Sequence, residues 1–306
     1  MERSELDKLL AYMVVSGGDK IVVRERVVMK AAQKIGCGIV TYNRPAGLSR
    51  LLKSISNSHL DEVVVVNDGD KLKGGLDVGV LLENDLNVGV GASKNRAASY
   101  LLEKGCEHIF LVEDDVYVKD ASVFERYIQA SKISGLQHLN FSQHGLLNKD
   151  GEGKAKPVMR VDYCEVRLAL YRHCVGAFSY YSRDCLRKVG LMDLDYFNAL
   201  EHVDHSLRII KEGMHPAFWF FADIENSESF IGDEPWAIAQ SKISSNPAHA
   251  KNVAAAIEVF EKKYGVKPGD YPVQSREKVA IELVRISEKY AERRAGSRAS
   301  VTVDFQ

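Results

Sequence analysis

A short apolar run that stops at three consecutive acids, within residues 107–120, constrains the fold most. The run is Ile109–Val112, and Glu113, Asp114 and Asp115 follow it directly. Four apolar residues in a row are typical of a strand that is buried on both faces, and the acids mark the sheet edge where that strand emerges. We therefore expect a buried sheet with functional groups at its acidic edge.

The three acids also predict a cation site. Carboxylates this close repel one another unless a cation neutralises them, and their oxygen atoms suit Mg²⁺ or Mn²⁺. Glu113 and Asp115 are two residues apart and would share one side of an extended chain, so they are the predicted metal ligands beside a phosphate-bearing substrate. On the triplet alone, an acidic turn after a core strand is an equally good interpretation.

Strand and helix patterns alternate before the acidic run. Ile35–Val40 and Val63–Val66 are typical of buried strands, and between them Pro45 opens a helix with leucine or isoleucine at 48, 51, 52 and 55. A weaker strand at 78–82 and a helix after the glycine-rich turn at 88–91 follow. This order predicts a parallel, right-handed α/β sheet, and a glycine turn at a helix N-terminus is suited to anions.

The rest of the chain is less regular. We expect strands at 138–142, 175–181 and 216–223, and helices at 123–133, 184–189 and 199–212. In the last of these helices the period places four apolar residues on one face and four polar ones largely off it. The first set is Val203, Leu207, Ile210 and Met214, and the second is Glu201, Asp204, His205 and Arg208. Helical patterns at 252–264 and 276–294 complete three predicted parts: an N-terminal extension (1–33), an α/β domain (34–232) and a small helical appendage (233–306).

Composition excludes several classes of protein. The chain is 45% hydrophobic and 27% charged, as in globular proteins, and its formal net charge of -1 gives no signal for a nucleic-acid partner. Five cysteines without a CxxC pair suggest neither a disulfide framework nor a thiolate zinc site. Neither a signal peptide nor a membrane-spanning run is evident, so a cytoplasmic protein is the expectation. The oligomeric state is not predicted.

Six segments occur in the order typical of one enzyme family. They are VTYNR (40–44), VVVNDGD (64–70), NVGVGASKNRA (87–97), FLVEDD (110–115), VGAFSYYSRDCLRKVGLMD (175–193) and EHVDHSLR (201–208). Together they resemble nucleotide-sugar-dependent glycosyltransferases of the GT-A fold, specifically glycosyltransferase family 2, over about residues 35–225. The resemblance implies an inverting transfer from a nucleoside-diphosphate sugar, a UDP-sugar above others, to a carbohydrate or other hydroxyl-bearing acceptor, with Mn²⁺ or Mg²⁺ as cofactor.

The resemblance also implies roles for single residues. The nucleotide-sugar site would comprise Thr41, Asn43, Arg44, Asp68, Lys94 and Asp114. Asp68 would accept a hydrogen bond from an N–H of the base, and Lys94 would approach the diphosphate where the family usually has arginine. Glu113 and Asp115 fill the acidic positions of the family's DxD motif, and Asp115 is the preferred direct metal ligand.

The family's catalytic base belongs to an acidic pair at the start of a helix, and here that pair is Glu201-His202, with Asp204 two residues later. All three are candidates for deprotonating the acceptor, in the order Glu201, Asp204, His202. The structural alternative is a capping box from Asn198 to Glu201 and an ion pair from Asp204 to Arg208. His173 and His215 are weaker candidates for metal ligands.

Two rival functions stay open. A sugar nucleotidyltransferase shares the fold class, although no glycine-rich, basic loop follows the first predicted strand. A non-catalytic module that binds nucleotide or carbohydrate would explain why histidine stands where the family's pair has its second acid.

Overall fold

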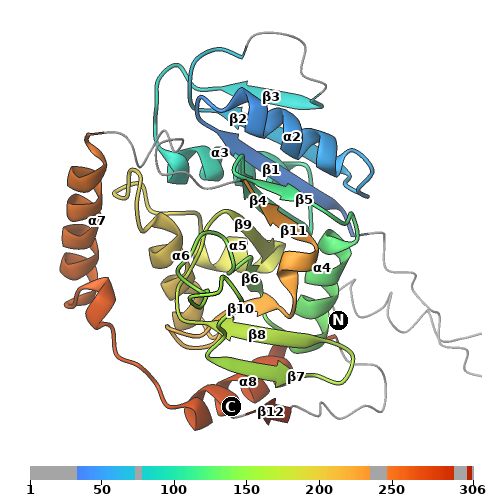
Figure 1. The fold of residues 1–306 in the computed structure, drawn as a ribbon, viewed down its shortest axis with the longest axis vertical. Helices are drawn as coiled ribbons and strands as arrows, with labels where there is room; N and C mark the ends of the chain where they lie inside the picture. Colours follow the sequence, from blue (N-terminus) through green and yellow to red (C-terminus); the bar gives the residue numbers. More distant parts are fainter. Residues whose placement is uncertain (1–32, 73–77, 235–246, 293–301, 305–306) are drawn as a thin grey trace, which may run out of the picture. The chain divides into compact units, whose positions relative to one another are not determined.

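The computed structural model describes residues 33–72, 78–234, 247–292 and 302–304. Its central sheet has six strands in the order β3-β2-β1-β4-β9-β6 (Figure 1). These are β1 (Ile35–Thr41), β2 (Glu62–Asn67), β3 (Val80–Glu83), β4 (His108–Glu113), β6 (His138–Asn140) and β9 (Phe178–Ser182). The first four run parallel, whereas β9 is antiparallel to both β4 and β6. The predicted mostly parallel α/β sheet is confirmed.

Both faces of this sheet are covered. Alternate residues of β4 enter different clusters, Phe110 and Val112 on one side and Ile109 and Leu111 on the other. Helices α2 (Pro45–Ile55) and α4 (Val123–Ser134) contribute to the first cluster, and α3 (Val90–Glu103) and α5 (Arg183–Val189) to the second. Because side chains of a strand point alternately to its two faces, β4 has to be apolar throughout, as its sequence is.

Two smaller sheets escaped prediction. One has the order β10-β8-β7-β12, formed by β7 (Met159–Asp162), β8 (Arg167–Tyr171), β10 (Phe221–Ile224) and β12 (Thr302–Asp304). The other pairs β5 (Val116–Val118) with β11 (Ile231–Asp233). The strand expected at 216–223 is only partly present, because Trp219 has a φ of 74° and the Phe220 amide bonds Ala217, which makes a turn.

The predicted buried face of helix α6 (Glu201–Lys211) is only partly present: Leu207 and, just after the helix, Met214 are buried as expected. Glu201, Asp204 and His205 are buried together with Leu207, whereas Val203 is only half-buried. These polar groups tolerate burial because neighbouring elements supply partners, such as the Gly190 carbonyl for His205 at 2.9 Å. The hydrophobic period therefore missed that the inner face of α6 mixes polar and apolar residues.

The C-terminal helices contact the main core. Val279, Leu283 and Ile286 of α8 (Arg276–Tyr290) lie in the same apolar cluster as Phe110, and Phe260 of α7 (His249–Tyr264) lies in a cluster with α6. The division into domains at residues 33 and 233 stays a prediction, and residues 1–32 of the predicted extension lie outside the described part.

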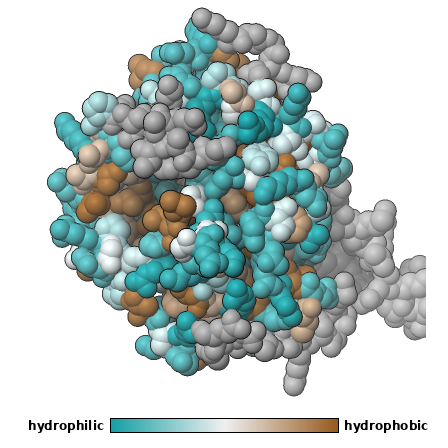
Figure 2. Space-filling view, in the orientation of Figure 1, coloured by the Kyte–Doolittle hydropathy of each residue, from teal (hydrophilic) through white to brown (hydrophobic). Residues whose placement is uncertain are grey.

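Seen from the side of Figure 1, the surface is mostly polar, with apolar residues in small separate patches (Figure 2). Among the described helices, none combines the length and apolarity needed to cross a membrane.

Candidate nucleotide site

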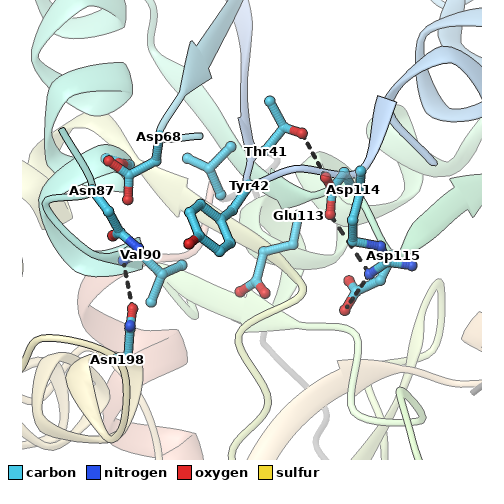
Figure 3. Close-up of a pocket in the computed structure, with 12 residues that line it drawn as sticks. Thr41, Tyr42, Asp68, Asn87, Val90, Glu113, Asp114, Asp115 and Asn198 are labelled. Atoms are coloured by element: carbon cyan, nitrogen blue, oxygen red, sulfur yellow. Dashed lines mark hydrogen bonds and ion pairs between the residues drawn. The ribbon is translucent and has the colours of Figure 1, made fainter. Parts of the chain in front are cut away.

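A hollow opens where β1, β2 and β4 end. Its empty space is about 570 Å³, including the open mouth. Its lining consists of Val40, Thr41, Tyr42, Arg44, Asp68, Asn87, Val90, Ser93, Glu113, Asp114, Asp115 and Asn198. Figure 3 shows Asp68, Asn87 and Asn198 on one side, Asp114 and Asp115 on the other, and Tyr42 and Glu113 between them. The carboxyl ends of parallel strands are the usual ligand-binding edge of an α/β sheet.

Thr41, Arg44 and Asp114 form one wall. The Thr41 hydroxyl donates to Asp114 Oδ2 at 2.6 Å, and Arg44 Nη1 lies 3.7 Å from Asp114 Oδ1. Burial raises the pKa of Asp114 to about 7, although the Thr41 hydrogen bond opposes this. Arg44 keeps 25% of its side chain exposed, so its guanidinium is available to an anion in the hollow.

Asp68 lines the opposite wall, and its carboxylate already accepts three hydrogen bonds. Oδ1 accepts from the Asn84 amide at 2.7 Å and from Val88 N at 2.9 Å, and Oδ2 accepts from Gly89 N at 2.9 Å. Asp68 thereby fixes the glycine-rich turn before α3, where Gly89 has a φ of 92°. Oδ2 accepts one of these hydrogen bonds, from Gly89 N, and an N–H of a nucleotide base would be its second donor. The role of Asp68 in binding the base stays a prediction.

Two predicted nucleotide-site residues do not line the hollow. Asn43 has a φ of 53° and its Oδ1 accepts from Asp70 N at 2.7 Å, which holds the loop after β2. Lys94 is buried and donates to Glu113 Oε1 and, at 2.9 Å, to the Gly176 carbonyl. Burial disfavours its charge, but Glu113 and Glu201 outweigh burial and raise the pKa of Lys94. Lys94 thus positions Glu113 and has no exposed face for a diphosphate.

The acidic motif is not extended. β4 ends at Glu113, and the chain turns at residues 114–115 before β5, so Glu113 and Asp115 do not share one side of a strand as predicted. Glu113 faces Lys94, whereas Asp115 Oδ1 is buried and has no hydrogen-bond donor in the described part of the chain. Asp115 Oδ2 lies 3.5 Å from Arg44 Nη1.

An unpartnered buried carboxylate oxygen fits a divalent cation. Asp115 is therefore the residue that would hold the predicted Mn²⁺ or Mg²⁺, and it is also the residue that the sequence favoured as the direct metal ligand. The described residues contain no group of three or more His, Cys, Asp or Glu side chains arranged to hold an ion. Water and phosphate oxygens would have to complete the coordination, as is usual for ions that bind with a nucleotide.

The three candidates for the base have different environments. Glu201 is 2% exposed, and His202 Nδ1 lies 2.9 Å from its Oε1. Burial alone would raise the pKa of Glu201, but His202 and Lys94 outweigh burial and lower it to about 2. His202 keeps 24% of its side chain exposed. Asp204 is fully buried and bonds Arg208, as the structural alternative predicted.

His202 lies next to a residue of the hollow's lining through Gly176 and Lys94. A Cβ placed on Gly176 would lie 3.0 Å from His202 Cγ and 3.1 Å from Lys94 Nζ, and Lys94 bonds Glu113, which lines the hollow. His202, Lys94 and Glu113 are therefore neighbours, although they come from three elements.

The contacts of Asn198, His215 and His173 test the predicted capping box and the two weaker metal-ligand candidates. Asn198 does not cap α6, because its Oδ1 accepts from Val90 N of α3 at 3.3 Å, so the capping-box interpretation is wrong. His215 is buried, with Nδ1 bonded to the Pro216 carbonyl and Nε2 to Ala222 N. His173 packs edge-on against Trp219. Neither histidine faces the acidic motif through any contact in the described residues.

Sequence reasoning missed several residues at this site. Tyr42, Asn87, Val90, Ser93 and Asn198 line the hollow, and Tyr42, Asn87, Val90 and Ser93 lie inside the quoted motifs, next to residues that were chosen. His144 was missed as well. Its Nε2 lies 3.6 Å from Asp115 Oδ2, and its position in the loop after β6 carries no motif.

Comparison with known proteins places this geometry on a known fold. The structure of GalNAc-T7 with UDP, GalNAc and Mn²⁺ aligns with a TM-score of 0.51 and 14% identity, over 76% of this chain and 50% of that chain. The fold is that of the GT-A glycosyltransferases. TarS residues 1–349 from S. aureus align over 83% of this chain and 81% of that chain, with a TM-score of 0.47 and 12% identity.

Mannosyltransferase PcManGT from Pyrobaculum calidifontis, in complex with GDP-Man and Mn²⁺, aligns over 58% of this chain and 52% of that chain, with a TM-score of 0.43 and 14% identity. The chain thus spans about half the length of PcManGT and of GalNAc-T7. No protein-family model and no curated protein sequence matches the chain. The GT-A fold predicted from the six motifs is confirmed by the match to GalNAc-T7.

Proposed function

We propose that this chain is an inverting glycosyltransferase that moves a sugar from a nucleoside-diphosphate sugar, preferably a UDP-sugar, to an acceptor hydroxyl. The observation that carries the proposal is the hollow at the ends of β1, β2 and β4. It combines an available guanidinium, Arg44, with an unpartnered carboxylate oxygen, Asp115 Oδ1, on a GT-A fold. A diphosphate and its counter-ion require this pairing of positive charge and free oxygen ligand.

The reaction breaks the bond between the anomeric carbon and the β-phosphate oxygen, which leaves negative charge on the diphosphate. Arg44 would bind that anion, and Asp115 would hold the divalent ion, which stabilises the leaving diphosphate when it is bound. Asp114, fixed by Thr41, keeps Arg44 directed at the hollow. Asp68 would shape the base end of the site through the turn that it holds.

The environments of Glu201 and His202 favour His202 as the proton acceptor. Glu201 is only 2% exposed, whereas His202 keeps 24% of its side chain exposed and is the more accessible of the two groups. Glu201 instead accepts from His202 Nδ1, so Nε2 is left to take the acceptor proton. The acceptor oxygen then attacks the anomeric carbon opposite the leaving diphosphate, which inverts its configuration.

The direct test is a screen of nucleotide sugars with mixed acceptors, Mn²⁺ and the full chain. Release of nucleoside diphosphate together with a glycosylated product, detected by mass spectrometry, is expected. Formation of a nucleotide sugar and pyrophosphate from a sugar phosphate and a nucleoside triphosphate would instead support the nucleotidyltransferase. Nucleotide binding without turnover of any donor would support the non-catalytic module.

A further inference from the structure

His144 is the histidine that the described structure places against the acidic motif. Its Nε2 lies 3.6 Å from Asp115 Oδ2, and its Nδ1 bonds Asp233 Oδ1 at 2.8 Å. Only 13% of the side chain is exposed. The mechanism described above gives this ring no task.

The position of the ring is fixed by a second carboxylate. Asp233 ends β11, whose pairing with β5 places it opposite Val116, the residue after Asp115. Asp233 Oδ2 also accepts from Gly145 N at 2.9 Å, which holds the loop that carries His144. The Glu234 amide donates to the Asp115 carbonyl at 2.8 Å, so the residue after Asp233 is also bonded to the turn after β4.

A carboxylate bound to one ring nitrogen of histidine leaves the other nitrogen as an oriented lone-pair donor. Histidines that ligate metal ions almost always donate their other ring N–H to a carboxylate, a backbone carbonyl or water. The 3.6 Å between Nε2 and Asp115 Oδ2 exceeds a hydrogen bond. Two ligands about 2.1 Å from one ion lie about 3.0 Å apart at a right angle and about 3.4 Å apart at the tetrahedral angle. A shift of about 0.2–0.6 Å would let His144 Nε2 and Asp115 Oδ2 bind one ion. Asp115 would then bind through Oδ2 or through both oxygens, since Oδ1 has no donor in the described part of the chain.

We propose that His144 is a metal ligand, which binds through Nε2 the same divalent cation as Asp115, while Asp233 orients the ring. The inference rests on the proposed function and refines its metal site. It replaces Glu113, which faces Lys94, as the second protein ligand. A nitrogen donor beside a carboxylate favours Mn²⁺ over Mg²⁺, because Mg²⁺ prefers oxygen ligands throughout.

The competing explanation is that His144 acts only as a cation. In the absence of an ion, a protonated ring beside Asp115 and Asp233 would help neutralise both carboxylates, together with Arg44, 3.5 Å from Asp115, and Lys149, 3.5 Å from Asp233. The two explanations differ in one observable property, since only a ligand places a nitrogen nucleus in direct contact with the metal.

Electron spin-echo spectroscopy of Mn²⁺ bound to the full chain, with and without UDP, distinguishes them. We expect a histidine nitrogen coupling that disappears in His144→Gln, with Mn²⁺ affinity at least 10-fold weaker. Asp233→Asn should weaken Mn²⁺ binding by about 10-fold to 100-fold, the effect typical of a lost outer-sphere partner. His59→Gln, at an exposed position outside the hollow, should leave both the coupling and the affinity unchanged.

Two results would overturn the proposal. Mn²⁺ that binds with UDP but shows no nitrogen coupling would exclude His144 as a ligand and leave the glycosyltransferase proposal intact. Absence of Mn²⁺ binding in every condition would exclude the metal site itself. Failure of the chain to bind any nucleotide, by contrast, would count against the proposed function, whereas the nitrogen coupling is measurable with Mn²⁺ alone.

Discussion

Replacing Asp204 with asparagine separates a structural role from a catalytic one. Asp204 is fully buried. Its Oδ2 accepts from Arg208 Nε at 2.9 Å, and its Oδ1 accepts from Lys263 Nζ at 2.7 Å and from the Tyr264 hydroxyl at 2.6 Å. The carboxylate therefore joins α6 to α7 and has no bond to spare for an acceptor hydroxyl.

The size of the effect follows from these three bonds. Asparagine keeps one acceptor oxygen, but its amide group directs two N–H donors at a cation where the second oxygen was. Because a hydrogen bond to a charged group contributes roughly 1.5–3 kcal/mol, we expect a loss of about 3 kcal/mol in the free energy of unfolding. At about 2 °C per kcal/mol, the unfolding midpoint should fall by roughly 6 °C.

Thermal unfolding followed by circular dichroism measures this, with UDP binding and turnover at a permissive temperature as the second readout. Asp193→Asn is the matched control, because Asp193 lies 2.7 Å from the same Lys263 but is 29% exposed. Asp193→Asn should lower the free energy of unfolding by less than about 1 kcal/mol, as for exposed ion pairs. An Asp204→Asn protein with an unchanged midpoint and abolished turnover would refute the reasoning and make Asp204 the base.

Three further changes test the site. Gly89→Ala would place a Cβ against the Phe197 carbonyl at a φ of 92°, so it should lower the free energy of unfolding by at least about 2 kcal/mol and expose the 191–200 loop to protease. The control Gly105→Ala has a φ of 81° and no neighbour within 4 Å, so it should lower the free energy of unfolding by only about 1 kcal/mol. Lys94→Met should cost about 3 kcal/mol in thermal unfolding, because Glu113 loses its partner; an unchanged midpoint would contradict the pairing. His202→Ala should lower turnover by about 100-fold and recover with added imidazole, whereas Glu201→Gln should lower it less; loss without rescue would point to Glu201 as the base.

The central strands were predictable because burial on both faces leaves a local signature. Residues 35–40, 63–66 and 109–112 carry no charged or amide side chain. Thr41, Asp68 and Glu113, which line the hollow, lie at or just after the ends of these strands. The helix at Pro45 was equally clear, since proline and the period of its apolar residues agree. Here the neighbouring residues in the sequence determine the structure.

Predictions failed where partners distant in sequence decide the outcome. Asp204 is buried on the inner face of α6 because Lys263 and Tyr264, some sixty residues later, bond its carboxylate. Lys94 follows a glycine-rich turn that predicts an anion site, yet its ammonium group bonds the Gly176 carbonyl and Glu113 instead. His144 meets Asp115 only because β11 and β5 pair across more than a hundred residues. No local pattern encodes such contacts.

The most direct test of the account is whether the hollow binds a nucleoside diphosphate. Isothermal titration of UDP, GDP and ADP with and without Mn²⁺ should give Mn²⁺-dependent binding of one of them, with UDP favoured. Val90→Trp, which fills the hollow from a half-buried position on its rim, should abolish that binding without changing the unfolding midpoint by more than a few degrees. Binding that persists unchanged in Val90→Trp, or no binding of any nucleoside diphosphate to the unmodified chain, would contradict it.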